Sequence, residues 1–147
     1  LDPAARREFW QMLSEVHAQD GVTILFTTHW FEEAENATHL GILDQGHLLA
    51  CDTPTALKER LGGEVISLST AETGPISAWL ASRYHIQAQL LPRKLRFSAP
   101  QIPDLVRELL QEHGAKLDSF NLHKPSLEDV FVDLTGRGFE PVEKASP

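Results

Sequence analysis

The chain has 147 residues, enough for one ordinary domain or two small ones. Hydrophobic residues make up 41% of it, which is ample for a core, and no apolar run approaches the length needed to span a bilayer. The formal net charge of −8 argues against a nucleic-acid partner, because phosphate binding needs a basic face. The single cysteine, Cys51, rules out an internal disulfide and fits a reducing compartment. The chain starts at Leu1 and its only methionine is Met12, so we expect it to be part of a longer protein.

Residues 1–29 predict a helix, a turn and a strand. Asp2 is a good N-cap, and Pro3 suits the first helical position, where its missing N–H costs nothing. Asp20-Gly21 ends the helix. Its apolar face is formed by Phe9, Met12, Leu13 and Val16, at helical spacing. Residues 22–28 are apolar and β-branched, which is typical of a strand buried on both faces of a parallel sheet.

His29 stands at the end of this predicted strand, and a short acid-rich helix follows it. In open α/β sheets ligand chemistry gathers at the carboxyl ends of strands, so His29 is a candidate site residue. The alternative is a strand-end histidine hydrogen-bonded to the backbone. Glu33 and Glu35 are predicted to form a solvated helix start that suits the helix dipole. The histidines lack the spacing of metal ligands, so we predict no metal site.

Residues 39–63 predict a β-hairpin and a helix. Two short apolar runs, 39–43 and 47–51, are separated by Asp44-Gln45-Gly46. Thr53-Pro54 then starts a helix that extends to about Arg60. Leu61-Gly62-Gly63 breaks the pattern and is the predicted boundary between a domain over 1–63 and one over 64–136.

The second domain alternates strands and helices. Its patterns predict strands at 64–69, 86–90, 95–99 and 115–122, and helices at 75–82 and 102–110. This β-α-β-β-α-β order is that of a ferredoxin-like split βαβ unit, and its apolar stripes are interpreted as core. Ser126 and Asp129 have the spacing of a capping box for one added helix. Residues 137–147 are predicted to be a disordered tail.

An ordered series of motifs resembles the later half of ABC-type ATPases. Leu1-Asp2-Pro3-Ala4-Ala5-Arg6-Arg7 is similar to the D-loop, and Thr28-His29 with Glu33-Ala34-Glu35 is similar to the switch-histidine loop. Leu43-Asp44-Gln45-Gly46 and Thr53-Pro54 through Leu57 resemble the hairpin and helix that close that domain. Pro125-Ser126-Leu127-Glu128-Asp129-Val130-Phe131 with Leu134-Thr135-Gly136-Arg137 is similar to the C-terminal extension of drug- and antibiotic-exporter ATP-binding subunits.

The resemblance implies an α/β fold: the C-terminal portion of a P-loop NTPase domain of the ABC type, followed by a small ferredoxin-like α+β domain. It implies that His29 is the switch histidine, which reaches the γ-phosphate of ATP and helps to orient the attacking water. It also implies that Asp2 is the D-loop aspartate that links two nucleotide sites, a role compatible with a plain N-cap. ATP and Mg²⁺ are the implied cofactors, but the sequence contains no GxxxxGK[ST] motif and no LSGGQ-like signature.

The implied function is that of an ATP-binding subunit of an ABC-type exporter, in which ATP binding and hydrolysis drive transmembrane transport. The implied partners are a second ATP-binding subunit and a transmembrane permease subunit, and the implied location is cytoplasmic, peripheral at the inner face of the membrane. We expect the fragment alone to be inactive, and residues 22–28 to expose an apolar edge. Two alternatives remain: a regulatory or dimerisation module built on the ferredoxin-like domain, or a structural domain whose motif matches arise by chance.

Overall fold

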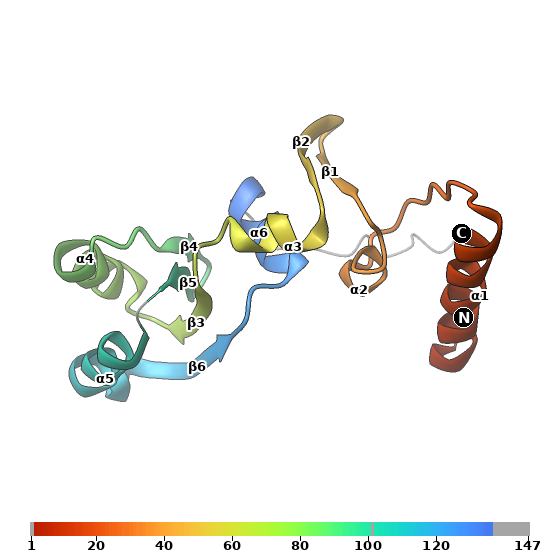
Figure 1. The fold of residues 1–147 in the computed structure, drawn as a ribbon. Coiled ribbons are helices and arrows are strands. Elements are labelled where there is room, and N and C mark those ends of the chain that lie inside the picture. Colours follow the sequence, from red (N-terminus) through yellow and green to blue (C-terminus); the bar gives the residue numbers. More distant parts are fainter. Residues whose placement is uncertain (1, 101, 137–147) are drawn as a thin grey trace, which may run out of the picture. The chain divides into compact units, whose positions relative to one another are not determined.

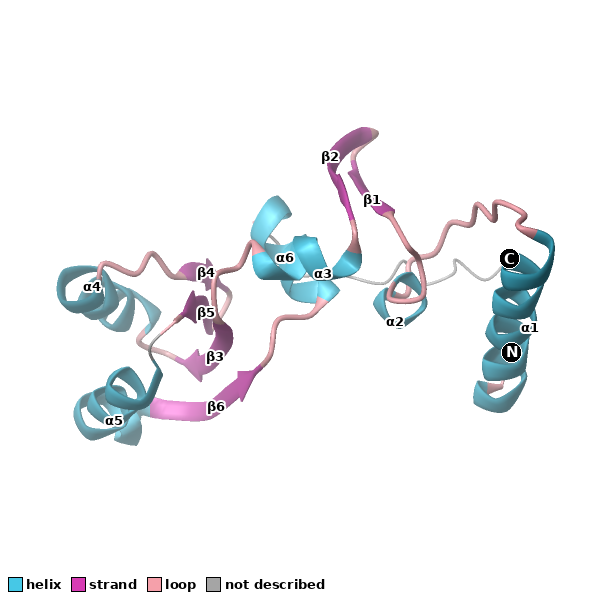
Figure 2. Cartoon of the chain, in the orientation of Figure 1, coloured by secondary structure: helices cyan, strands magenta, loops and turns pink. Residues whose placement is uncertain are grey.

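The computed structural model describes residues 2–100 and 102–136 (Figures 1 and 2). These residues form two compact units. One unit extends to Ala37 and the other begins at Thr38. Helices and β-sheets both occur, so the predicted mixed α/β character is confirmed. No helix among the described residues is long and apolar enough to cross a membrane. The predicted tail at 137–147 lies outside the described residues.

The first unit contains helix α1 (Pro3–Asp20) and the single-turn helix α2 (Phe31–Ala34). The start and end of α1 are as predicted. Asp2 caps its N-terminus, and Gly21 ends it with a φ of 63°, a left-handed conformation that glycine adopts without steric cost. The apolar face of α1 is largely exposed: Phe9 is 44% exposed and Met12 52%.

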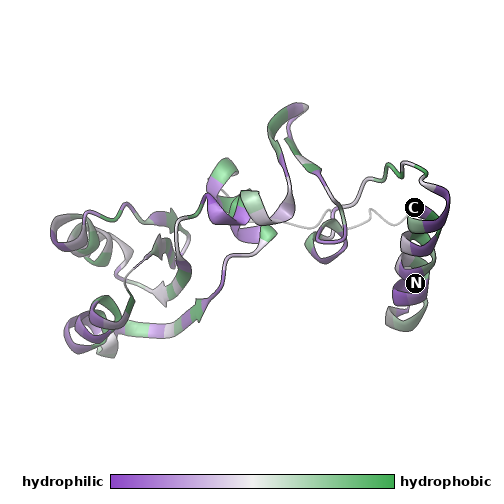
Figure 3. Ribbon diagram, viewed as in Figure 1, coloured by the Kyte–Doolittle hydropathy of each residue, from purple (hydrophilic) through white to green (hydrophobic). Residues whose placement is uncertain are grey.

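The strand predicted over residues 22–28 is wrong, because this segment has no regular secondary structure. Leu25 is 92% exposed, and Figure 3 shows hydrophobic residues both here and along α1. A buried parallel strand needs hydrogen-bonded neighbours and a layer on each face. The described residues provide neither for this segment. The apolar composition of this segment therefore shows that it is suited to burial in a sheet, but the neighbouring strands that would form that sheet are not among the described residues.

The second unit begins with an antiparallel hairpin of β1 (Leu40–Asp44) and β2 (His47–Asp52). Gln45 and Gly46 connect the strands with φ values of 48° and 80°, as the favoured two-residue turns require. Helix α3 (Pro54–Glu59) follows. The Thr53 hydroxyl accepts a hydrogen bond from the Ala56 backbone N–H at 3.1 Å and so caps it. The predicted hairpin and helix are both confirmed.

A four-stranded antiparallel sheet follows, in the order β4-β5-β3-β6. Its strands are β3 (Glu64–Thr70), β4 (Gln89–Leu91), β5 (Lys94–Ala99) and β6 (Leu117–His123). Helix α4 (Thr73–Tyr84) connects β3 to β4, and α5 (Ile102–His113) with a short 3₁₀ turn (Gly114–Lys116) connects β5 to β6.

Two predicted strand starts are wrong. The strand predicted from residue 86 begins at Gln89, because the Ile86 backbone N–H donates to Leu80 O and closes the end of α4. His85 precedes it with a positive φ of 57°. The strand predicted from residue 115 begins at Leu117, because residues 114–116 form the 3₁₀ turn that redirects the chain out of α5.

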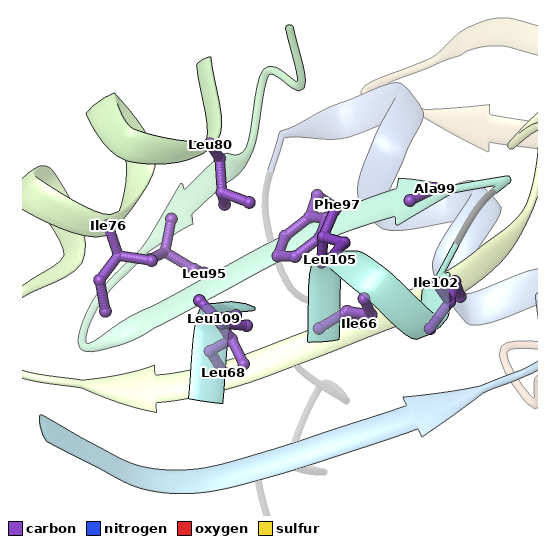
Figure 4. Close-up of a cluster of buried hydrophobic side chains, with 10 residues drawn as sticks. All are labelled: Ile66, Leu68, Ile76, Leu80, Leu95, Phe97, Ala99, Ile102, Leu105 and Leu109. Atoms are coloured by element: carbon purple, nitrogen blue, oxygen red, sulfur yellow. The ribbon is translucent and has the colours of Figure 1, made fainter. Parts of the chain in front are cut away.

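The main core lies between one face of this sheet and the helices α4 and α5 (Figure 4). Antiparallel pairing places Ile66 opposite Phe97 and Leu68 opposite Leu95. The helices contribute Ile76 and Leu80 from α4, and Ile102, Leu105 and Leu109 from α5. Most of the apolar positions interpreted as core are therefore buried, whereas Leu110 of α5 is 45% exposed and does not belong to it.

Helix α6 (Leu127–Thr135) closes the described chain and packs against α3. Ser126 and Asp129 form the predicted capping box at its N-terminus. Because the second compact unit begins at Thr38, the hairpin and α3 belong to the same unit as the sheet. The predicted domain boundary at 61–63 thus lies inside this unit. The division of the chain into an ATPase part over 1–63 and a separate domain over 64–136 stays a prediction.

Candidate functional site

Asp2 lies at the N-terminus of α1, exposed to solvent. Its Oδ1 accepts hydrogen bonds from the backbone N–H groups of Ala4 at 2.7 Å and Ala5 at 3.2 Å. These groups would otherwise lack partners, since the first turn of a helix has no intrahelical acceptors. Oδ1 is therefore engaged within α1, while Asp2 as a whole stays accessible.

His29 lies in the connection between α1 and α2 and is exposed. Among the described residues its ring makes no hydrogen bond, and it lies beside the Trp30 ring, with ring centroids 5.5 Å apart. The alternative of a histidine hydrogen-bonded to the backbone is therefore not what the described residues show. An exposed imidazole can donate or accept a proton at either nitrogen.

The backbone on both sides of His29 is held by the Thr28 hydroxyl. This hydroxyl donates to Glu33 Oε2 at 2.6 Å and accepts from the Trp30 backbone N–H at 3.0 Å. The two bonds bracket His29, so the turn is fixed while the imidazole stays free to meet another group.

Glu33 connects this turn to α1. Its other carboxylate oxygen lies 3.5 Å from Nε of Arg6, and its side chain is only 21% exposed. The Arg6 guanidinium also lies over the Trp30 ring, 5.0 Å from the centroid, at cation–π distance. The prediction of a solvated Glu33 is therefore wrong, because Thr28 and Arg6 both bind its carboxylate.

Two further contacts hold the segment before His29 against α1. The Phe26 ring meets Trp10 edge to face, with centroids 4.7 Å apart. His17 Nδ1 lies 2.8 Å from the Val22 carbonyl oxygen. Aromatic and polar contacts thus take the place of the expected strand pairing.

The structure does not bring the two predicted site residues into one cluster. The Asp2 carboxylate caps its own helix, whereas His29 belongs to the turn bracketed by Thr28. Sequence reasoning missed the supporting roles of Thr28 and Arg6. A hydroxyl directly before His29 and a carboxylate five residues after that hydroxyl were the available signal.

A cleft of about 410 Å³ lies between α1 and α2. It is lined by Arg6, Arg7, Trp10, Gln11, Ser14, Glu32, Glu33 and Asn36. Its two arginines are matched by two glutamates, so the lining is not the uniformly cationic surface that a polyphosphate would need. Neither predicted site residue lines this cleft.

The sequence matches several ATP-binding proteins over nearly its whole length. It is 34% identical over 97% of its residues to daunorubicin resistance ATP-binding protein DrrA2 of Streptomyces coeruleorubidus. It is 33% identical over 93% to linearmycin resistance ATP-binding protein LnrL of Bacillus subtilis, and 36% identical over 93% to Nod factor export ATP-binding protein I of Rhizobium meliloti. The chain spans 47%, 47% and 40% of these three relatives. No family model matches it.

Proposed function

We propose, since the chain belongs to the family of ABC transporter ATP-binding subunits of drug and antibiotic exporters, that it contributes the switch-histidine part of an ATPase. In the complete subunit, ATP binding and hydrolysis would drive transmembrane export. The observation that carries this proposal is His29, whose ring is exposed on a turn that Thr28, Glu33 and Arg6 hold in place.

His29 would donate a ring N–H to a γ-phosphate oxygen as negative charge develops there. Preorganisation supports this role, because a donor fixed before the reaction needs no rearrangement during it. The hydroxyl bridge at Thr28 supplies that fixation from inside the chain. Asp2 would contribute from the D-loop, with its accessible carboxylate at the start of α1.

The residues of this chain do not by themselves fit ATP and Mg²⁺. The described cleft has a balanced lining, and the sequence lacks the glycine-rich loop with its lysine that cradles phosphates. The phosphate cradle and the Mg²⁺ ligands of the proposed site would therefore be supplied by residues other than these 147, and His29 would act on a nucleotide held by them. We expect the 147-residue chain alone to hydrolyse no ATP, and turnover that depends on His29 in this chain would contradict that.

We further propose that residues 64–136 form a ferredoxin-like domain with one added helix. This is supported by the β-α-β-β-α-β order and by the strand order β4-β5-β3-β6, in which the first and third strands lie at the centre. The proposed partners are a second ATP-binding subunit and a transmembrane permease subunit, which would hold the protein at the inner face of the membrane.

The test is ATP turnover by the full-length subunit with its permease in lipid vesicles. His29→Ala is expected to lower kcat by about 10²–10³, the effect of removing one preorganised donor. Its thermal stability should stay at the parental value, because His29 is exposed and unbonded among the described residues. His39→Ala, which also removes an exposed histidine, is the matched control. Parental turnover by His29→Ala would refute the proposal.

A further inference from the structure

Asp129, in the first turn of α6, binds groups from two strands of the sheet. Its carboxylate forms an ion pair with Arg96 of β5 and lies 3.1 Å from Nε2 of His123, the last residue of β6. It also accepts from the Ser126 backbone N–H at 2.6 Å and from the Ser126 hydroxyl at 2.7 Å. The Asp129 side chain is 1% exposed, so these four donors replace its water shell.

Both side chains of the Arg96–Asp129 ion pair are largely shielded from solvent. The Arg96 side chain is 15% exposed, and burial lowers its pKa, while the nearby carboxylates of Glu128 and Asp133 act in the opposite direction. Removing one member of a buried pair leaves an uncompensated charge and is strongly destabilising. The attachment of α6 to the sheet therefore depends on both charges.

The apolar residues of α6 lie outside the main core. Leu127, Val130 and Val132 of α6 and Leu57 of α3 are buried, yet none belongs to the cluster between the sheet and the helices α4 and α5. Because α3 and α6 pack together, these residues are best described as a second, smaller core. The two helices thus cover each other's apolar surface.

A half-open pocket of about 280 Å³ lies between α6 and the sheet. It is lined by residues of β3, β4, β5 and α6 and of the segment before β4, among them Gln89, Arg96, Asp129 and Asp133. A further hydrogen bond joins β4 to α6: the Gln89 side-chain amide donates to the Val132 carbonyl oxygen at 2.7 Å. Polar bonds around a pocket, with the buried Val65 of β3 in its lining, therefore join α6 to the sheet.

We propose that α3 and α6 form a clamp that is held on the sheet by the Asp129 carboxylate and can leave it as a unit. Loss of Arg96 or of the Asp129 charge would release both helices while the main core stays folded. In the intact chain the clamp fixes the hairpin, which directly precedes α3, to the sheet.

The test is hydrogen–deuterium exchange of the 147-residue chain, read by mass spectrometry. In Arg96→Gln and in Asp129→Asn, amides of residues 54–59 and 127–135 should exchange at least about tenfold faster, as expected when a buried pair is broken. Amides of residues 76–80 and 102–109 should exchange at the parental rate. Arg93→Gln is the control, since it removes an arginine from an ion pair with Asp118 in which both side chains are exposed.

Two results would overturn the proposal. Unchanged exchange in 54–59 and 127–135 in both variants would show that the polar cluster does not hold the clamp. Equal acceleration in the main core would show that the clamp is not separable, and complete unfolding of both variants would show the same.

Discussion

Removing the Thr28 hydroxyl tests whether its two hydrogen bonds hold the His29 turn. Thr28→Val keeps the size and branching of the side chain and removes both of its hydrogen bonds. A hydrogen bond to a charged group contributes about 1.5–3 kcal/mol. Glu33 is partly exposed and keeps Arg6 as a partner, so water can replace part of this loss. We therefore expect Thr28→Val to lower the stability of the closed His29 turn by about 1 kcal/mol.

The most direct assay is amide exchange at Trp30, measured by NMR on the 147-residue chain. The Trp30 N–H donates to Thr28 in the parent, and a loss of 1 kcal/mol corresponds to about a fivefold faster exchange. Thr27→Val is the matched control, because Thr27 is exposed and has the same side chain one position earlier. Exchange at Trp30 that is equal in the two variants would refute this account of the turn.

Three further predictions follow from burial and charge. Leu57→Ala should lower the free energy of unfolding, measured in urea, by about 2–5 kcal/mol, because Leu57 is fully buried. Leu48→Ala, at an exposed site, should change it by less than about 0.5 kcal/mol. Equal effects of the two substitutions would contradict the second core. Arg83 lowers the pKa of Glu108 below its ordinary 4.5, so the stabilisation from this pair is complete above that value and disappears as pH falls through the lower folded-state pKa. The stability difference between Glu108→Gln and the parent should shrink as urea melts are taken below pH 4.5, and a constant difference would be contrary. The chain should self-associate through residues 1–60, and Leu25→Glu should reduce this in sedimentation experiments, whereas a monodisperse parental monomer would argue against it.

Local signals predicted the helix ends well. An aspartate before proline, a threonine before proline and a serine three residues before an aspartate each became a cap with the expected side-chain hydrogen bond. These interactions join residues within one turn, so a short window of sequence contains both partners. The turn at Gln45-Gly46 was predictable for the same reason.

Signals that depend on distant partners were less informative. The composition of residues 22–28 fits a buried strand, but no strand lies beside it within the described residues. The opposite case is Asp129, whose capping role is local and was predicted. Its bonds to Arg96 and His123 arise only when three elements meet, and no spacing along the sequence announces them.

Glu33 shows how a correct local interpretation can still miss a site. An acidic residue at a helix start is favoured by the dipole alone, so its presence needed no further explanation. In the structure it also connects the turn at Thr28 to Arg6, which lies near the N-terminus of α1 and therefore far away in the sequence. The carboxylate therefore has a positioning role that a dipole argument does not contain.

The central position of β3 constrains the order in which the second unit can form during synthesis. β3 pairs with β5, about 30 residues later, and with β6, about 50 residues later, so its two neighbours leave the ribosome long after it does. Sheets that depend on such distant pairing fold slowly, because long loops must close before any contact compensates for the lost entropy. An aggregation-prone nascent strand is the consequence, and a ribosome stalled shortly before Leu117 should carry a chain that chaperones still recognise.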